Sequence, residues 1–427
     1  MSSSARLILH IGTEKTGTTS IQEFLSLNRA TLASRKIYTP SFTASSNHVE
    51  ISLCVYRDFW KDELSTLWNL PDEPEARHQV QSDWIERLRS EVNDSGPDSL
   101  WIISSESLQS RIVHFVDIQR LSAILHQIFD DITILLYIRE PISLALSLWS
   151  TGVKCGNYMP KLPTPTDDYF YNACHHLSTY QRWGKAFGSK PVVRIYENES
   201  FYCSDLLRDF CHACGLQWDS QYTLPPRSNT RLSSKSLACI NYINQALPLY
   251  SSTTSINPIR GDLTSFLEGL CPEGSGYRPS YAEVQLYRQT FDASNEELRR
   301  LLFSDRATLF LTTHNPCHLQ EVSALDATLS SDEINLLDVI VSIWSDRTAR
   351  INNLRERLEA KPSGDLPPQN SAANSGSQAA YNYVPDSHRL IAAFRLLLRI
   401  PSYLFRYLLI ISSFTSLQKI LRISSSR

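Results

Sequence analysis

The chain has 427 residues, of which 42% are hydrophobic and 20% are charged. This composition supplies a sizeable core and excludes a disordered chain, a collagen-like repeat and a small disulfide scaffold. The formal net charge of −3 argues against a protein dedicated to nucleic-acid binding. The charge is uneven, because residues 388–427 hold seven Lys and Arg but no Asp or Glu. Such an asymmetry predicts a separate task for this tail.

Nine cysteines are scattered along the chain without regular spacing. An odd, irregular set is typical of reduced thiols in a cytoplasmic protein rather than of a secreted disulfide framework. The apolar run at 7–11 is too short for the core of a signal peptide and predicts a first strand instead. Cys211 and Cys214 have C-x-x-C spacing, but no second pair accompanies them, so we expect no metal site. The sequence therefore predicts a cytoplasmic protein.

Short apolar runs alternate with helical patterns over the first two-thirds of the chain, an order that predicts β-α units on a parallel sheet. The expected strands are nearly continuous apolar runs, as strands buried on both faces are; they are 7–11, 100–104, 132–138 and 191–196. The expected helices are 18–27, 141–151, 175–187 and 202–214. The fold class is therefore α/β, with a central parallel sheet flanked by helices and a C-terminal helical extension.

Four segments are expected along the chain. Residues 1–320 form the α/β domain, 321–360 a C-terminal helix, 361–387 a disordered linker and 388–427 a basic amphipathic tail. Apolar residues recur close to a 3.6-residue period from 334 to 358, which predicts one long helix over 331–360 that ends before Pro362. The residues that follow are rich in Pro, Ser, Asn, Gln and Gly, the composition of a flexible linker.

Within the tail, Arg395, Arg399 and Arg406 share one helical face, and apolar residues fill most of the rest. The longest uncharged stretch runs from 407 to 418, which is too short to span a bilayer. Segment 388–423 therefore either lies in a membrane interface, as basic amphipathic segments do, or docks as a helix on the protein's own surface. The first alternative places the protein peripherally at the inner face of the membrane.

The segment from His10 to Ser20 follows the first expected strand and opens the first expected helix. Backbone N–H groups and a helix N-terminus at such a place form an anion site. Gly12 and Gly17 let the backbone approach the anion, and Lys15 adds a positive charge. Hydroxyl donors come from Thr16, Thr18, Thr19 and Ser20. Because an ordinary strand–helix turn rarely combines these features, the segment predicts a phosphate-binding loop.

Gly12 and Gly17 have the glycine spacing of the Walker A motif, but Thr18 stands where that motif requires Lys. The lysine of this chain lies three residues earlier, inside the loop. In this respect the segment resembles the 5′-phosphosulfate loop of sulfotransferases that use 3′-phosphoadenosine 5′-phosphosulfate (PAPS). The resemblance implies a P-loop-type sheet and PAPS as co-substrate without a metal. It also implies that Lys15 contacts the oxygen that bridges phosphate and sulfur.

A second element places Arg139 at the carboxyl end of an expected strand, where ligands bind in open α/β sheets. Ser147 follows eight residues later on the next expected helix. A guanidinium and a hydroxyl can grip one phosphate from two sides. The pair resembles the 3′-phosphate site of the sulfotransferase family, which has the same spacing.

Less specific sequence matches within 177–240 occur in the order that is expected of a bacterial-type sulfotransferase domain. The resemblance then covers roughly residues 5–315 and leaves out the linker and the tail. It implies that a loop with Arg227, Asn229, Arg231 and Ser233 reaches the donor nucleotide, without assigning individual contacts.

The resemblance implies transfer of a sulfuryl group from PAPS to a hydroxyl or amine of a carbohydrate, glycolipid or small-molecule acceptor. Lys15 then stabilises charge on the leaving phosphate oxygen, and the acceptor needs a general base. Glu106, directly after an expected strand, and His48, in the loop after the first β-α unit, are the two main candidates; Glu14 is a third. Each has a structural alternative. Glu106 can cap a helix at 107–111, and the other two can be solvated loop residues.

Two other functions stay open on the sequence alone. One is a P-loop nucleotide kinase or NTPase, against which the threonine in the Walker lysine position argues. The other is a non-catalytic, membrane-attached protein that binds a nucleotide without turnover. No nucleic-acid partner is expected.

Overall fold

The computed structural model describes residues 5–226, 232–250, 257–261, 263, 276–311 and 329–359. Within these residues the chain divides into two compact units. The first takes 5–149, 162–226 and 278–311, and the second takes 150–161, 232–250, 257–261, 263, 276–277 and 329–359. The predicted linker at 361–387 and the predicted tail at 388–427 lie outside the described residues.

The first unit is built on a five-stranded sheet with the order β2-β3-β1-β4-β5. Its strands are β1 (Ala5–His10), β2 (Ile37–Tyr38), β3 (Ser99–Ser104), β4 (Asp131–Ile138) and β5 (Val192–Ile195). Every paired strand is parallel to its neighbour. The carboxyl ends of all five strands therefore lie at one edge of the sheet, with β1 between β3 and β4.

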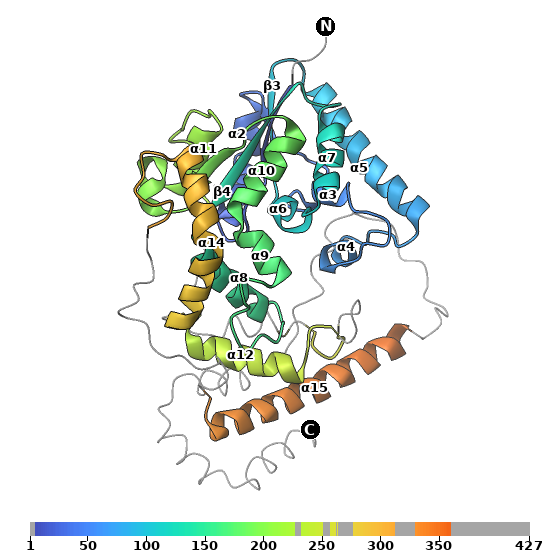
Figure 1. Ribbon diagram of the computed structural model, residues 1–427. Coiled ribbons are helices and arrows are strands. Elements are labelled where there is room, and N and C mark those ends of the chain that lie inside the picture. Colours follow the sequence, from blue (N-terminus) through green and yellow to red (C-terminus); the bar gives the residue numbers. More distant parts are fainter. Residues whose placement is uncertain are drawn as a thin grey trace, which may run out of the picture. The chain divides into compact units, whose positions relative to one another are not determined.

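The helices of the first unit cover both faces of this sheet (Figure 1). They are α1 (Thr18–Leu27), α2 (Arg29–Ala33), α3 (Val49–Leu53), α4 (Glu63–Leu67), α5 (Pro74–Asp94), α6 (Ser107–Arg111), α7 (Phe115–Leu125), α9 (Asp168–Cys174), α10 (His176–Phe187), α11 (Leu206–Ala213) and α14 (Tyr281–Leu302). Helix α8 (Pro141–Lys154) begins in the first unit and continues into the second.

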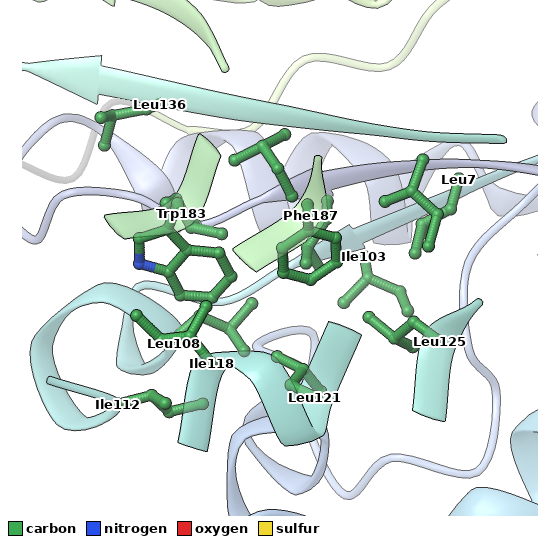
Figure 2. Close-up of a cluster of buried hydrophobic side chains, with 14 of the residues drawn as sticks. Leu7, Ile103, Leu108, Ile112, Ile118, Leu121, Leu125, Leu136, Trp183 and Phe187 are labelled. Atoms are coloured by element: carbon green, nitrogen blue, oxygen red, sulfur yellow. The ribbon is translucent and has the colours of Figure 1, made fainter. Parts of the chain in front are cut away.

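The alternation of side chains along β1 explains the two layers of helices. Leu7 and Leu9 belong to a hydrophobic cluster that also contains Trp183 and Phe187 of α10 (Figure 2). Ile8, between them, belongs to the cluster on the opposite face, with Phe24 of α1. Successive residues of a strand point to opposite faces, so an apolar run of this kind requires cover on both. Helix α1, which follows β1, covers the face to which Ile8 points. Helices α5, α7 and α10 cover the face to which Leu7 and Leu9 point.

The strands predicted at 7–11, 100–104, 132–138 and 191–196 are confirmed as β1, β3, β4 and β5, and the α/β parallel fold is confirmed with them. The helices predicted at 18–27, 141–151 and 175–187 are confirmed as α1, α8 and α10. Strand β2 was not predicted, because its two residues give no apolar run that a pattern can reveal.

The helix predicted at 202–214 is wrong at its start. A short 3₁₀ turn occupies Tyr202–Ser204, and α11 begins only at Leu206. The side chain of Asp205 accepts a hydrogen bond from the backbone N–H of Arg208 and so caps the helix. The backbone N–H of Tyr202 bonds instead to the buried carboxylate of Asp209, at 2.8 Å. These two aspartates separate the turn from the helix.

The second unit contains α12 (Ser234–Ala246) and α15 (Ser331–Glu359). The two helices contact each other through an ion pair between Lys235 and Glu333 and a hydrogen bond from the Tyr242 hydroxyl to Asp338, at 2.9 Å. Helix α15 confirms the long helix predicted over 331–360. Among the described helices, none combines the length and the apolar character needed to cross a membrane.

Candidate functional site

The predicted phosphate loop lies at the carboxyl end of β1, beside β4. Its first residues continue the strand pairing: the N–H of Ile11 donates to Leu135 O at 3.0 Å, and the N–H of Thr13 donates to Tyr137 O at 2.8 Å. The N–H of Tyr137 in turn donates to Gly12 O at 2.7 Å. The start of the loop is therefore held by the sheet itself.

The rest of the loop turns sharply into α1. Gly12, Lys15 and Gly17 all have positive φ, at 94°, 61° and 78°. The Thr16 hydroxyl donates to Thr13 O at 2.6 Å and closes the turn. Gly17 is the N-cap of α1 and offers no side-chain cap, so within the described residues the first amides of this helix receive none. Such amides are available to an anion.

The loop glycine Gly12 lies against the backbone of Glu106. A Cβ at position 12 would lie 3.0 Å from the Cβ and 3.1 Å from the Cα of Glu106. We expect Gly12→Ala to lower the free energy of unfolding by roughly 1–2 kcal/mol for the left-handed backbone and about 1–3 kcal/mol more for this overlap.

Gly96 provides the matched control for that substitution, because its φ is 76° and nothing lies within 4 Å of an added Cβ. Gly96→Ala should therefore show the backbone cost alone. Urea denaturation of both variants measures the difference. Equal losses of stability would mean that the close approach of the loop to residue 106 has no energetic weight.

Arg139 directly follows β4 and reaches the phosphate loop. Its Nη1 donates to the backbone carbonyl oxygen of Lys15 at 2.9 Å. Its guanidinium also lies 5.6 Å from the ring centroid of Tyr196, a cation–π distance. The backbone carbonyl of Arg139 accepts a hydrogen bond from His176 Nε2 at 2.7 Å. The two cationic residues predicted to hold phosphates are thus brought together at one edge of the sheet.

The remaining residues predicted to bind the donor differ in how far they are buried. Ser147 lies on a half-buried face of α8, one turn after Ser143. Thr18 is buried, whereas Thr19 is exposed to solvent. Arg231, together with Arg227 and Asn229, lies outside the described residues.

Glu106 does not cap the helix that follows it. It occupies the N-cap position of α6, but its side chain makes no cap hydrogen bond. Its carboxylate instead accepts a hydrogen bond from Gln22 Nε2 at 2.7 Å on Oε2 and one from Asn47 Nδ2 at 3.2 Å on Oε1. Burial raises the pKa of Glu106, and hydrogen bonds from its own backbone N–H, from Gln22 and from Thr18 partly offset that rise.

His48 is buried rather than solvated, at 2% exposure. Its Nδ1 accepts a hydrogen bond from the backbone N–H of Ser104 at 3.0 Å, and the backbone N–H of His48 donates to Ser104 O at 3.2 Å. Burial lowers the pKa of His48 to about 3. The imidazole thus ties the 41–48 loop to the end of β3, and its Nδ1 lone pair is already occupied.

Glu14 is half-buried, and it does not stand alone in solvent. Its carboxylate lies near Tyr169 of α9. Burial and the negative charge of Glu14 raise the pKa of Tyr169 well above the usual value. The guanidinium of Arg111 lies 5.5 Å from the Tyr169 ring centroid and pairs with Glu63 of α4. Polar groups from α4, α6 and α9 therefore gather beside the phosphate loop.

Sequence reasoning missed Gln22, Asn47, Arg111 and Tyr169 as neighbours of the loop. Gln22 is one turn after Thr18 on α1, a spacing that places both on one helix face; that signal was present in the sequence. The others come from segments that only the tertiary fold brings to the loop.

Three buried histidines surround this edge of the sheet: His10, His48 and His176. Burial lowers their pKa values to about 3, about 3 and about 4. Below the unfolded-state pKa of about 6.5, the unfolded chain binds protons that the folded chain does not. The free energy of unfolding should therefore fall by on the order of 4 kcal/mol between about pH 7.5 and about pH 5.5.

Urea denaturation of the protein at those two pH values measures this fall. His176→Gln should remove about a third of it, whereas substitution of the exposed His212 should leave it unchanged. A pH-independent stability in the wild type would contradict the burial of three neutral imidazoles.

No protein-family model matches this chain, and no curated protein sequence does. Among solved structures, the chain is similar to a sulfotransferase from Alicyclobacillus acidocaldarius. The two are 16% identical, and the match covers 56% of this chain and 92% of that chain at a TM-score of 0.32.

Proposed function

We propose that the protein is a sulfotransferase that moves a sulfuryl group from PAPS to a hydroxyl or amine of a carbohydrate, glycolipid or small-molecule acceptor. The observation that carries the proposal is the hydrogen bond from Arg139 Nη1 to Lys15 O. This bond joins Lys15, which is proposed to bind the 5′-phosphosulfate of PAPS, to Arg139, which is proposed to bind the 3′-phosphate. The uncapped amides of α1 supply further donors for the 5′-phosphate.

The residues around the loop fit the steps of such a transfer. The acceptor oxygen attacks sulfur while the bond from sulfur to the 5′-phosphate oxygen breaks, and that phosphate oxygen keeps the electron pair. Lys15 stabilises the charge that develops there. Glu106 takes the proton of the acceptor hydroxyl, because its Cα and Cβ lie beside Gly12 of the loop and its carboxylate is bonded to Gln22 of α1, the helix that starts there. His48, whose Nδ1 is already bonded to Ser104, is the weaker candidate.

A P-loop kinase or NTPase is the less favoured function. Its lysine must follow the second glycine of the loop to reach the β- and γ-phosphates. In this chain Thr18 holds that position, and its hydroxyl is a hydrogen-bond partner of Glu106. A kinase requires an ammonium group at this position, whereas here the side chain at position 18 is bonded to the carboxylate of Glu106.

Sulfur-35-labelled PAPS, incubated with the full-length protein and pooled glycan and lipid extracts, tests the function. We expect the label to move to an acceptor fraction. Tight binding of adenosine 3′,5′-bisphosphate without any transfer would support a non-catalytic nucleotide-binding protein instead. Consumption of ATP without use of PAPS would support a kinase or NTPase.

A further inference from the structure

The carboxylate of Glu106 is held by an amide on each of its two oxygens. Gln22 donates to Oε2 and Asn47 donates to Oε1, over sequence separations of 84 and 59 residues. Gln22 belongs to α1, the helix that starts at the phosphate loop, and it is 4% exposed. Two unrelated segments therefore converge on one acid.

Each amide is itself oriented by a further hydrogen bond. The Ser105 hydroxyl donates to Asn47 Oδ1 at 2.7 Å, which leaves the Nδ2 donor of Asn47 facing Glu106. The amide nitrogen of Gln22 also reaches the carbonyl oxygen of Ser104, at 3.4 Å. Because each amide has its partner fixed, neither can rotate to present its oxygen to the carboxylate without losing a bond.

We propose that Gln22 and Asn47 are positioning residues of this site, which fix the Glu106 carboxylate beside the phosphate loop with one N–H donor on each oxygen. This inference rests on the proposed function, in which Glu106 is the general base. The Thr18 hydroxyl and the backbone N–H of Glu106 itself are further hydrogen-bond partners of this carboxylate. Amide N–H groups favour the charged form of the acid over the neutral one.

The surroundings of Glu106 otherwise oppose its ionised form. Burial raises its pKa, and the negative charge of Glu14 in the phosphate loop raises it further. The 41–48 loop contributes His48, which is buried and has a strongly lowered pKa, so it supplies no positive charge. The hydrogen bonds from the backbone N–H of Glu106, from Gln22 and from Thr18 oppose these two effects. Asn47, which donates to Oε1, adds a further donor to the charged form.

The titration of Glu106 in the unliganded full-length protein tests the inference directly. Infrared difference spectra against Glu106→Gln isolate the carbonyl stretch of the protonated acid, without any need for turnover. Gln22→Met and Asn47→Leu remove one donor each at similar volume. Each should raise the pKa of Glu106 by about one unit, which is tenfold in proton affinity.

Two buried amides elsewhere in the first unit provide matched controls. Gln81 donates to Leu53 O and Tyr56 O, and Asn28 donates to Phe24 O and Thr223 O. Gln81→Met and Asn28→Leu should lower stability without moving the Glu106 titration. An unchanged Glu106 pKa in both Gln22→Met and Asn47→Leu would overturn the inference.

The result separates this inference from the proposed function. If neither variant moves the titration while the wild type transfers labelled sulfate, the positioning role fails and the function stands. If both variants move the titration but the wild type transfers nothing, the amide pair acts on Glu106 as inferred and the sulfotransferase assignment fails. In the supporting case the lower limb of the pH–rate profile moves to higher pH in both variants, because the base must be ionised to act.

Discussion

Replacement of Lys15 by alanine is expected to lower the rate of sulfuryl transfer on the order of 10²–10³-fold. In the proposed reaction, the ammonium group offsets charge that develops on the leaving phosphate oxygen as the bond to sulfur breaks. The stability of the protein should change little. The carbonyl of residue 15, which accepts the bond from Arg139, is present in either residue, and lysine already occupies the left-handed conformation.

Lys36 is the matched control for this substitution. Its φ is 59°, close to the 61° of Lys15, and its Nζ donates to Pro97 O at 3.3 Å. It precedes β2 and so lies at the amino edge of the sheet, away from the phosphate loop. Lys36→Ala should leave the transfer rate unchanged. Similar rates for the two variants would remove Lys15 from the reaction.

Glu106→Gln should lower kcat by about 10²–10⁴-fold, the contribution typical of a positioned general base. The affinity for adenosine 3′,5′-bisphosphate should stay close to that of the wild type, because in the proposed reaction the acid binds the acceptor hydroxyl and not the nucleotide phosphates. Rapid-quench transfer from labelled PAPS gives kcat, and calorimetry gives the affinity. A loss of affinity without a loss of kcat would assign Glu106 to nucleotide binding instead.

Glu91 provides a comparable carboxylate outside the site. It is half-buried on α5 and accepts hydrogen bonds from both the backbone N–H and the hydroxyl of Ser41. Glu91→Gln therefore removes the charge of a hydrogen-bonded glutamate in the same unit. Its transfer rate should match that of the wild type. A loss equal to that of Glu106→Gln would point to a general effect of charge on folding.

The strands and the phosphate loop were predictable because their signals are local. An apolar run such as that of β1 specifies a strand buried on both faces, and the glycines, lysine and hydroxyls that follow it specify an anion loop. The same logic placed Arg139 at the carboxyl end of β4. Parallel strands align their carboxyl ends at one edge, so a residue that ends one strand lies near the loop that ends its neighbour.

The environment of Glu106 was not predictable, because its partners depend on packing. Nothing in the sequence near Asn47 indicates a bond to a residue 59 positions away. The prediction of where α11 starts was wrong for a related reason: the backbone N–H of Tyr202 bonds to Asp209 across the turn. That buried aspartate also accepts from the Tyr137 hydroxyl and from Arg194 Nε, at 2.7 and 3.0 Å. Patterns of hydrophobicity carry no record of such polar contacts.

His48 illustrates how burial changes the role of a residue type. A loop histidine near a ligand site is a reasonable candidate for proton transfer, since its ordinary pKa lies near neutrality. Burial removes that property by lowering the pKa to about 3, and the backbone of Ser104 occupies Nδ1. The sequence gives the residue type and its approximate place, whereas the solvation and partners that decide its chemistry come from the fold.

Calorimetric titration of the full-length protein with adenosine 3′,5′-bisphosphate and, separately, with ATP and Mg²⁺ compares the two kinds of nucleotide that the phosphate loop could bind. If Lys15 and Arg139 form one site for a nucleotide with phosphates on both its 3′ and 5′ oxygens, the bisphosphate binds at least about tenfold more tightly than ATP–Mg, a difference of about 1.4 kcal/mol. Tighter binding of ATP–Mg would contradict such a site.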